Sequence, residues 1–184
     1  THNSGGGCGQ PRVVLDLVDR LVLHKPPSWE VDDAVEVSTG WSLSDFLESL
    51  MCPRQRPVVR DDLHQHGFLH RLDVPSSGLI LAAKTYEAFY DLQLQLKAGS
   101  LVREYLVACR GWLPPARREV RARVLWAEED NLPVVVGRRG KPSRTGLRTL
   151  SHALHPRGKA AVSLLDVRIG TGRRHQIRVH TAHV

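Results

Sequence analysis

A lone carboxylate, that of Asp73, stands between two apolar stretches of the sequence. The chain is apolar at 67–69, turns over 75–78 and is apolar again at 79–83. A carboxylate in apolar surroundings loses its hydration and becomes neutral unless a cation pairs with it. Arg71, or a guanidinium from elsewhere, would supply that cation, with an attraction of about 4 kcal/mol at roughly 4 Å and an effective dielectric of about 20. An ionised, sheltered Asp suits work as a nucleophile or a general base.

The same residue also fits a purely structural role. Asp is common at the first position of turns, and a Pro-Ser-Ser-Gly sequence begins at position 75. From this stretch alone, the catalytic and the turn interpretations of Asp73 are both open.

Three histidines close to Asp73 raise a metal alternative. His64, His66 and His70 form a cluster of the kind that binds zinc. No Cys or Glu completes a familiar zinc spacing around them, so solvated or hydrogen-bonded histidines are favoured. A histidine-based metallohydrolase is therefore kept only as a minor hypothesis.

Composition describes an ordinary globular chain of 184 residues, with 41% hydrophobic and 24% charged residues. We expect one core domain at 13–184 after a flexible, Gly-rich lead at 1–12. No secretion signal and no apolar run of about 20 residues is present, so no membrane partner is expected. Cys8, Cys52 and Cys109 are widely spaced, which fits a reducing compartment. These features predict an intracellular protein, cytoplasmic or organellar.

The positive charge is concentrated in the second half of the chain. Residues 1–102 hold 9 Lys and Arg against 13 acidic residues, a net charge of −4, whereas residues 103–184 hold 17 against 6, a net charge of +11. Lys141 and Lys159 are the only lysines in the second half. Arg side chains bind phosphate through two donors at once and stack on bases. An RNA partner is therefore favoured over a merely solvated basic face.

The hydrophobic pattern predicts an α+β fold. In the first half it indicates strands at 13–18, 21–23 and 79–83, and helices at 42–50 and 85–98. Ser42 and Thr85 are the expected N-caps, and Leu50 is expected on the buried face of the first helix.

In the second half, further strands are expected in a largely antiparallel sheet, at 101–109, 119–126, 132–136, 144–154 and 160–169. The last element is a predicted helix, capped by Thr171 and running from about Arg173. With Arg173 and Arg174, its first turn would suit a phosphate group.

Three sequence blocks, in order, resemble RluA-type RNA pseudouridine synthases of the RsuA/RluA-like class. The first is His70-Arg71-Leu72-Asp73 followed by Ser77-Gly78-Leu79, which resembles the family's H-R-L-D signature. The second, Arg103-Glu104-Tyr105, resembles its K-x-Y segment. The third, Gly172-Arg173-Arg174-His175-Gln176-Ile177-Arg178-Val179-His180, resembles its G-R-T/S-H-Q-I/L-R-V-H block.

The resemblance implies an isomerase that converts uridine to pseudouridine in structured RNA, either ribosomal or transfer RNA, with no cofactor and no metal. It implies catalytic roles for Asp73, Tyr105 and Arg178, in which Arg178 pairs with Asp73 and Tyr105 packs against the base. Without the resemblance, a strand Tyr is better explained as a core residue. The motifs also imply RNA-binding roles for His70, Arg71, Arg173, Arg174 and His175.

The sequence departs from the family pattern in three places. Lys25-Pro26 is followed by Pro27-Ser28-Trp29, where the family has a small residue and then Gly. Arg174 replaces the usual Thr or Ser, and family members continue beyond the position of Val184 through a Gly-His-Pro stretch and final strands. We therefore expect a core that is incomplete at its C-terminal side. An alternative function follows, an inactive RNA-binding protein of the same fold or a ribonucleoprotein subunit.

Overall fold

The protein is described by a computed structural model, which defines residues 9–31, 42–52, 54–126, 135–154 and 160–184. The chain forms two compact units, Thr1–Ala98 and Gly99–Val184. Each unit has its own sheet and its own buried core. Residues 1–8 of the predicted lead lie outside the described residues.

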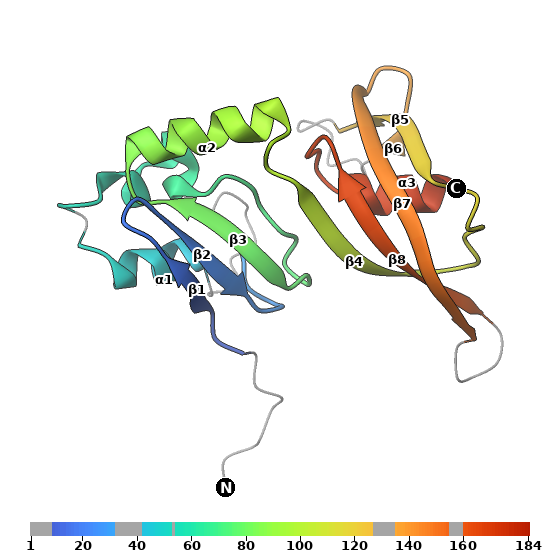
Figure 1. Ribbon diagram of the computed structural model, residues 1–184, viewed down its shortest axis with the longest axis horizontal. Helices are drawn as coiled ribbons and strands as arrows, with labels where there is room; N and C mark the ends of the chain where they lie inside the picture. The colour runs from blue at the N-terminus through green and yellow to red at the C-terminus, as the bar shows by residue number, and fades with distance from the viewer. Residues whose placement is uncertain (1–8, 32–41, 53, 127–134, 155–159) are drawn as a thin grey trace, which may run out of the picture. The chain divides into compact units, whose positions relative to one another are not determined.

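The first unit is built on a three-stranded antiparallel sheet in the order β1-β2-β3 (Figure 1). Its strands are β1 (Arg12–Asp16), β2 (Arg20–Lys25) and β3 (Gly78–Ala83). The three strands predicted for this half of the chain are therefore confirmed. Along β2, Leu21, Leu23 and Lys25 are buried and alternate with more exposed residues, because successive side chains of a strand point to opposite faces.

Helical segments complete the first unit. They are α1 (Leu43–Leu50), α2 (Tyr86–Ala98) and two 3₁₀ turns, η1 (Pro57–Arg60) and η2 (Asp62–Gly67). The predicted N-caps are confirmed, since Ser42 Oγ accepts from Ser44 N at 3.1 Å and Thr85 Oγ1 accepts from Ala88 N at 3.2 Å. The prediction for Leu50 was wrong. Its side chain is 47% exposed, because it ends α1 and lines an open surface pocket beyond the core.

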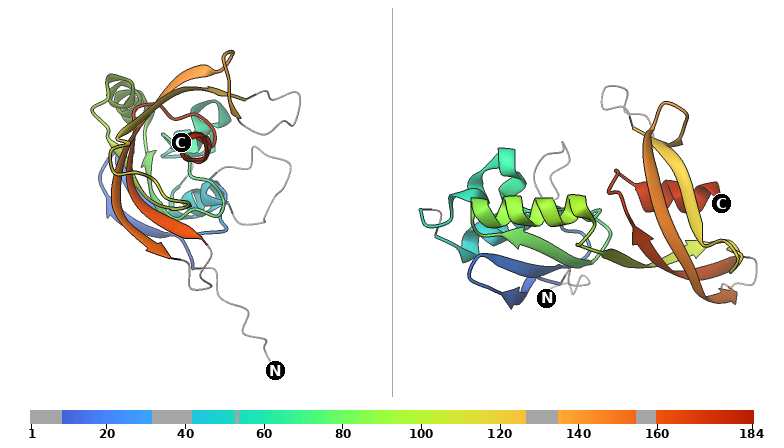
Figure 2. Two further views of the ribbon diagram at one scale, coloured as in Figure 1. Left: turned by 90° about the vertical axis from the view of Figure 1, so that its right-hand side faces the viewer. Right: turned by 45° about the horizontal axis from the view of Figure 1, so that its top comes forward.

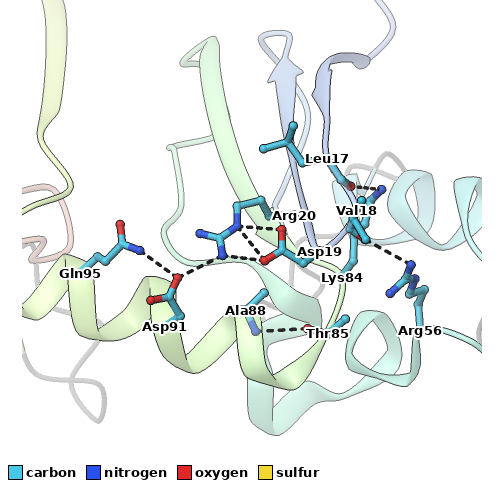
Figure 3. Close-up of polar contacts among 10 residues, drawn as sticks. All are labelled: Leu17, Val18, Asp19, Arg20, Arg56, Lys84, Thr85, Ala88, Asp91 and Gln95. Atoms are coloured by element: carbon cyan, nitrogen blue, oxygen red, sulfur yellow. Dashed lines mark hydrogen bonds and ion pairs between the residues drawn. The ribbon is translucent and has the colours of Figure 1, made fainter.

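A polar network holds the turn between β1 and β2 against α2 (Figure 3). Arg20 Nη2 lies 2.6 Å from Asp19 Oδ2 and 3.1 Å from Asp91 Oδ2 on α2. The hydrogen bond from Arg20 holds the pKa of the Asp19 carboxyl below its ordinary value. The main-chain N–H of Lys84 donates a hydrogen bond to Asp19 O at 2.7 Å, and its ammonium group donates one to Leu17 O at 2.6 Å. The C-terminal end of β3 is thereby fixed.

The second unit is a five-stranded antiparallel sheet in the order β4-β8-β7-β5-β6 (Figure 1). Its strands are β4 (Arg103–Arg110), β5 (Glu119–Leu125), β6 (Val135–Val136), β7 (Lys141–Leu154) and β8 (Ala161–Ile169). The α+β prediction with largely antiparallel pairing is confirmed. Of the strand predicted at 132–136, residues 132–134 lie outside the described residues.

One face of this sheet is buried and the other is exposed. The buried face carries a core of Leu113, Val120, Leu147, Leu165, Val167 and Ile169. Helix α3 (Gln176–His183) packs on this face against β5, β6 and β7, inside the curve of the sheet (Figure 2). The sheet therefore sets the position of the last motif, which lies in α3 and the turn before it.

The described helices are short. The longest, α2, has 13 residues, whereas a membrane-spanning helix needs about 20. Within the described part of the chain, no helix combines the length and the apolar character needed to cross a bilayer.

Candidate active site

The segment that carries the first motif runs beside β3 as an extended chain. Leu69 N donates to Leu81 O at 3.2 Å, and Leu81 N donates to His70 Nε2 at 3.4 Å. Residues 67–83 therefore form a hairpin-like unit. Asp73 lies at its turn, between the extended segment and β3.

The turn itself begins at Asp73. Ser76 N donates to Asp73 O at 2.9 Å, the hydrogen bond of a four-residue turn. The turn interpretation is thus confirmed for the main chain of Asp73. The carboxylate belongs to a half-buried residue and Arg71 is exposed. The catalytic interpretation concerns this side chain and stays a prediction.

A buried lysine holds the Asp73 turn in place, and the sequence analysis missed it. Lys25 is 0% exposed, and its ammonium group donates to Val74 O at 3.2 Å, next to Asp73. It also donates to Pro26 O at 3.0 Å and to Trp29 O at 2.7 Å. A buried ammonium group is costly unless its donors are satisfied. Three main-chain carbonyls therefore compensate this charge and tie two loops together at the turn.

The two-residue period of β2 contains the signal that would have found Lys25. Its position continues the buried series of Leu21 and Leu23, so a charged side chain there must face inward. In the strand register Lys25 pairs with Gly78, the first residue of β3.

The loop after β2 explains one departure from the family pattern. Ser28 stands where the family has Gly, and its φ is 68°, in the left-handed region that favours Gly. Its N–H donates to Val74 O at 2.8 Å, so Val74 O accepts from both Ser28 and Lys25. The loop therefore has the backbone conformation expected of a Gly at this position. Ser28 adopts this conformation at a cost in backbone strain.

Tyr105 lies on the inward face of β4 in the second unit. It pairs with Val167 of β8 and packs, half-buried, against the core of this sheet. The strand predicted to carry Tyr105 is therefore confirmed. Its ring is partly in the core, and its predicted contact with a base stays a prediction.

The last helix begins later than predicted. Helix α3 starts at Gln176, and His175 before it has a left-handed φ of 51° and makes no capping hydrogen bond with its side chain. Thr171 does not cap the helix either, because its hydroxyl oxygen accepts from Arg144 N at 3.3 Å while its O–H donates to Gln176 Oε1 at 2.8 Å. Arg173 and Arg174 therefore lie in the turn before α3, where the Gln176 side chain accepts from Arg173 N at 3.1 Å.

Two polar residues of the last motif anchor α3 to β7. Gln176 Nε2 donates to Thr145 Oγ1 at 3.0 Å, and His180 Nδ1 lies 2.9 Å from the same hydroxyl. All three side chains are buried, with exposed fractions of 2% or less. Burial holds the pKa of His180 below its ordinary value. The sequence analysis gave these residues no role, although their spacing of four places them on one helix face.

The arginines of the motif are exposed. They are Arg173, Arg174 and Arg178, whereas His175 is half-buried. The Arg174 guanidinium lies over the Trp126 ring, with its carbon 4.9 Å from the ring centroid. Anchoring by Gln176 and His180 thus leaves the cationic side chains on accessible surface.

The predicted site residues are divided between the two units. Asp73, with His70 and Arg71, belongs to the first unit, and Tyr105, with the motif around α3, belongs to the second. The pairing of Asp73 with Arg178 stays a prediction.

The three histidines near Asp73 make ordinary hydrogen bonds. His64 Nδ1 lies 2.8 Å from Asp61 Oδ2, His66 Nδ1 lies 3.2 Å from Val59 O, and His70 accepts from the main chain of β3. Among the described residues, no group of three or more His, Cys, Asp or Glu side chains is arranged to hold a metal ion. These contacts support the hydrogen-bonded interpretation.

Comparison with known protein families gives a match to the family described as RNA pseudouridylate synthase, over residues 19–183. The chain belongs to this family. Among curated pseudouridine synthases, it is 31% identical over 176 residues to ribosomal large subunit pseudouridine synthase D of Yersinia pestis. It is 37% identical over 179 residues to the protein of the same name from Nitrosomonas europaea. The predicted RluA-type resemblance is confirmed.

The chain spans about half the length of the curated pseudouridine synthases it matches. The two alignments cover 94% and 92% of this chain but 50% and 46% of the relatives. Among solved structures, human RNA pseudouridylate synthase domain containing 1 matches with a TM-score of 0.68 at 24% identity, covering 98% of this chain and 68% of that chain. Human RNA pseudouridylate synthase domain containing 4 matches with a TM-score of 0.62 at 18% identity, covering 93% and 63%. Both structures share the fold.

Proposed function

We propose that the chain is the catalytic core of an RNA pseudouridine synthase that isomerises uridines in structured RNA. The family match over residues 19–183, within which Asp73, Tyr105 and Arg178 are all present, carries the proposal. The names of the relatives favour large-subunit ribosomal RNA over transfer RNA as the substrate. An RNA substrate also favours a site of action in the cytoplasm or an organelle.

The reaction rearranges one nucleotide without a net gain or loss of atoms. The bond between N1 of uracil and C1′ of ribose breaks, the base rotates, and a bond forms between C5 and C1′. The proton on C5 leaves and N1 takes up a proton. The balance requires neither an oxidant nor a reductant.

The motif residues divide this work between them. Asp73 either attacks the sugar or starts an elimination, and Arg178 keeps the carboxylate ionised. Tyr105 packs against the base, and Arg71 holds the nucleotide out of its stack. Flipping a nucleotide costs a few kcal/mol, which phosphate contacts of the basic second unit offset.

Local structure around Asp73 supports this assignment. A catalytic group must be held in a fixed position, and the Asp73 turn is closed by its own hydrogen bond from Ser76. The next carbonyl, Val74 O, accepts from buried Lys25 and from Ser28. Hydrogen bonds from Ser76, Lys25 and Ser28 therefore fix the turn.

The test is an Asp73→Asn variant, assayed by release of the C5 hydrogen from RNA labelled on uridine. We expect no release above background, with RNA affinity unchanged because the substitution leaves the basic surface intact. Asp62→Asn is the matched control, since this exposed carboxylate lies in the same unit. Full activity in Asp73→Asn would disprove the catalytic role. RNA binding without isomerisation by the wild-type chain would favour the inactive RNA-binding alternative.

A double-mutant cycle tests the proposed pair of Asp73 and Arg178. Paired charges give coupling energies of about 0.5–3 kcal/mol in unfolding measurements. We expect Arg178→Ala to abolish activity and to lower stability less in the Asp73→Asn background than in the wild type. A coupling energy of zero would show that the two side chains do not meet.

A further inference from the structure

An exposed tryptophan and an arginine meet beside the start of α3. Trp126 follows the last residue of β5 and is 40% exposed. Arg174, in the turn before α3, places its guanidinium over the ring of Trp126, 4.9 Å from the ring centroid. Arg174 stands where the family pattern has a short Thr or Ser. The contact therefore depends on a side chain that departs from the family pattern.

Trp126 and Arg174 can each bind a ligand while they contact one another. Among the described residues of the second unit, ion pairs involve Arg121, Arg144 and Arg148, and none involves Arg174. A guanidinium stacked on an indole still has N–H donors that suit a phosphate. The exposed part of the indole offers a surface on which a base can stack.

The sequence around α3 indicates what kind of ligand Trp126 and Arg174 would bind. Arg173 precedes Arg174, Arg178 follows four residues later, and the stretch 103–184 has a net charge of +11. A cationic surface with an exposed aromatic ring is the combination that binds single-stranded nucleic acid. Because the proposed function places the reacting uridine at Asp73 and Tyr105, a base at Trp126 belongs to a neighbouring nucleotide.

We propose that Trp126 and Arg174 form a stacking subsite for an unpaired nucleotide that flanks the target uridine. The choice of RNA as the ligand rests on the proposed function. In this subsite the indole of Trp126 stacks on the base, and Arg174 binds the adjoining phosphate. The enzyme would thereby prefer uridines in single-stranded loops to uridines in duplexes.

The experiment measures binding of a labelled single-stranded oligouridine and of an RNA duplex to the full chain by fluorescence anisotropy. We expect Trp126→Ala to weaken single-strand binding by about 5- to 150-fold, the range for loss of a stacked base, and Arg174→Ser to weaken it through loss of the phosphate contact. Binding to the duplex should change little. Trp126→Phe keeps an aromatic ring and should restore most of the affinity.

Trp112→Ala is the matched control. Trp112 is 63% exposed in the same unit, but its ring stacks on His152, with centroids 3.6 Å apart, and not on an arginine. We expect this variant to bind both RNAs as the wild type does. An equal loss in Trp112→Ala would show a general loss of affinity and overturn the subsite.

Two other results would also overturn the inference. A lower melting temperature of Trp126→Ala with unchanged RNA affinity would show that the pair only holds local structure. Tighter binding by Arg174→Ser would show that the Arg174 guanidinium opposes RNA binding and does not bind a phosphate. Release of the C5 hydrogen is assayed separately. Selective loss of single-strand binding in a chain without activity would support the subsite and reject the proposed function.

Discussion

The ammonium group of Lys25 donates a hydrogen bond to the main-chain carbonyl oxygen of Val74, 3.2 Å away and 49 residues later in the sequence. This bond joins the end of β2 to the turn that begins at Asp73. Two further carbonyls, of Pro26 and Trp29, accept from the same ammonium group. The Asp73 turn is therefore hydrogen-bonded to a buried ammonium group that lies far from it in the sequence.

Replacing Lys25 with Met should loosen the Asp73 turn. Met fills a similar volume but removes the donor to Pro26 O and Trp29 O, whereas Val74 O keeps the N–H of Ser28; each buried group that loses its donor costs about 1–3 kcal/mol. We expect a loss of about 3 kcal/mol in the free energy of unfolding, measured in urea. Isomerisation should fall by about 10- to 100-fold with unchanged RNA affinity, because small displacements of a reacting group are costly. Lys97→Met, at an exposed lysine of α2, is the control and should change neither quantity.

Replacing Ser28 with Gly should stabilise the first unit. Ser28 has a φ of 68°, and a left-handed conformation costs a residue other than Gly about 1–2 kcal/mol. The greater freedom of Gly in the unfolded chain cancels about half of that gain, so we expect about 0.5–1 kcal/mol of net stabilisation in thermal unfolding. Ser77→Gly, at an exposed residue without positive φ, should be neutral or destabilising. Equal effects of the two substitutions would show that Ser28 is not strained.

Local features of the sequence predicted much of the fold. The N-caps Ser42 and Thr85 act within one helical turn, and the strands follow from short apolar periods. The predicted start of α3 at Arg173 is wrong, because the Thr171 hydroxyl accepts from Arg144 N of β7, and not from a main-chain N–H of the helix. A propensity rule cannot anticipate that competition.

The parts of the site that sequence reasoning missed depend on distant contacts. Lys25 is held by carbonyls of two loops, and Gln176 and His180 meet Thr145, which lies more than 30 residues earlier. Gln176 and His180 are polar and buried, so composition and hydrophobic period classify them as ordinary surface, whereas the period of β2 does place Lys25 inward. Only the packed fold shows where their hydrogen-bond partners are.

Replacing Thr145 with Val tests the anchor of α3. Val keeps the shape of Thr but removes the hydroxyl that Gln176 and His180 both contact. Because buried polar atoms lose a partner, we expect the free energy of unfolding to fall by about 1–3 kcal/mol in urea denaturation. Thr149→Val is the control, since Thr149 on the same strand makes only a long contact of 3.5 Å, to Leu113 O. A loss no greater than that of the control would mean that the shared hydroxyl does not anchor the helix.

His180 should make the stability of the protein depend on pH below neutrality. Burial lowers the pKa of His180 from its ordinary value of 6.5 in the folded protein, so the unfolded chain binds the proton more readily. The contribution of neutral His180 is therefore fully present above pH 6.5 and is lost as the pH falls below that value, with a slope of at most about 1.4 kcal/mol per pH unit for one proton. We expect His180→Asn to be less stable than the wild type at neutral pH and to lose less stability on acidification, in urea titrations across this range. An unchanged slope in His180→Asn would show that another group titrates.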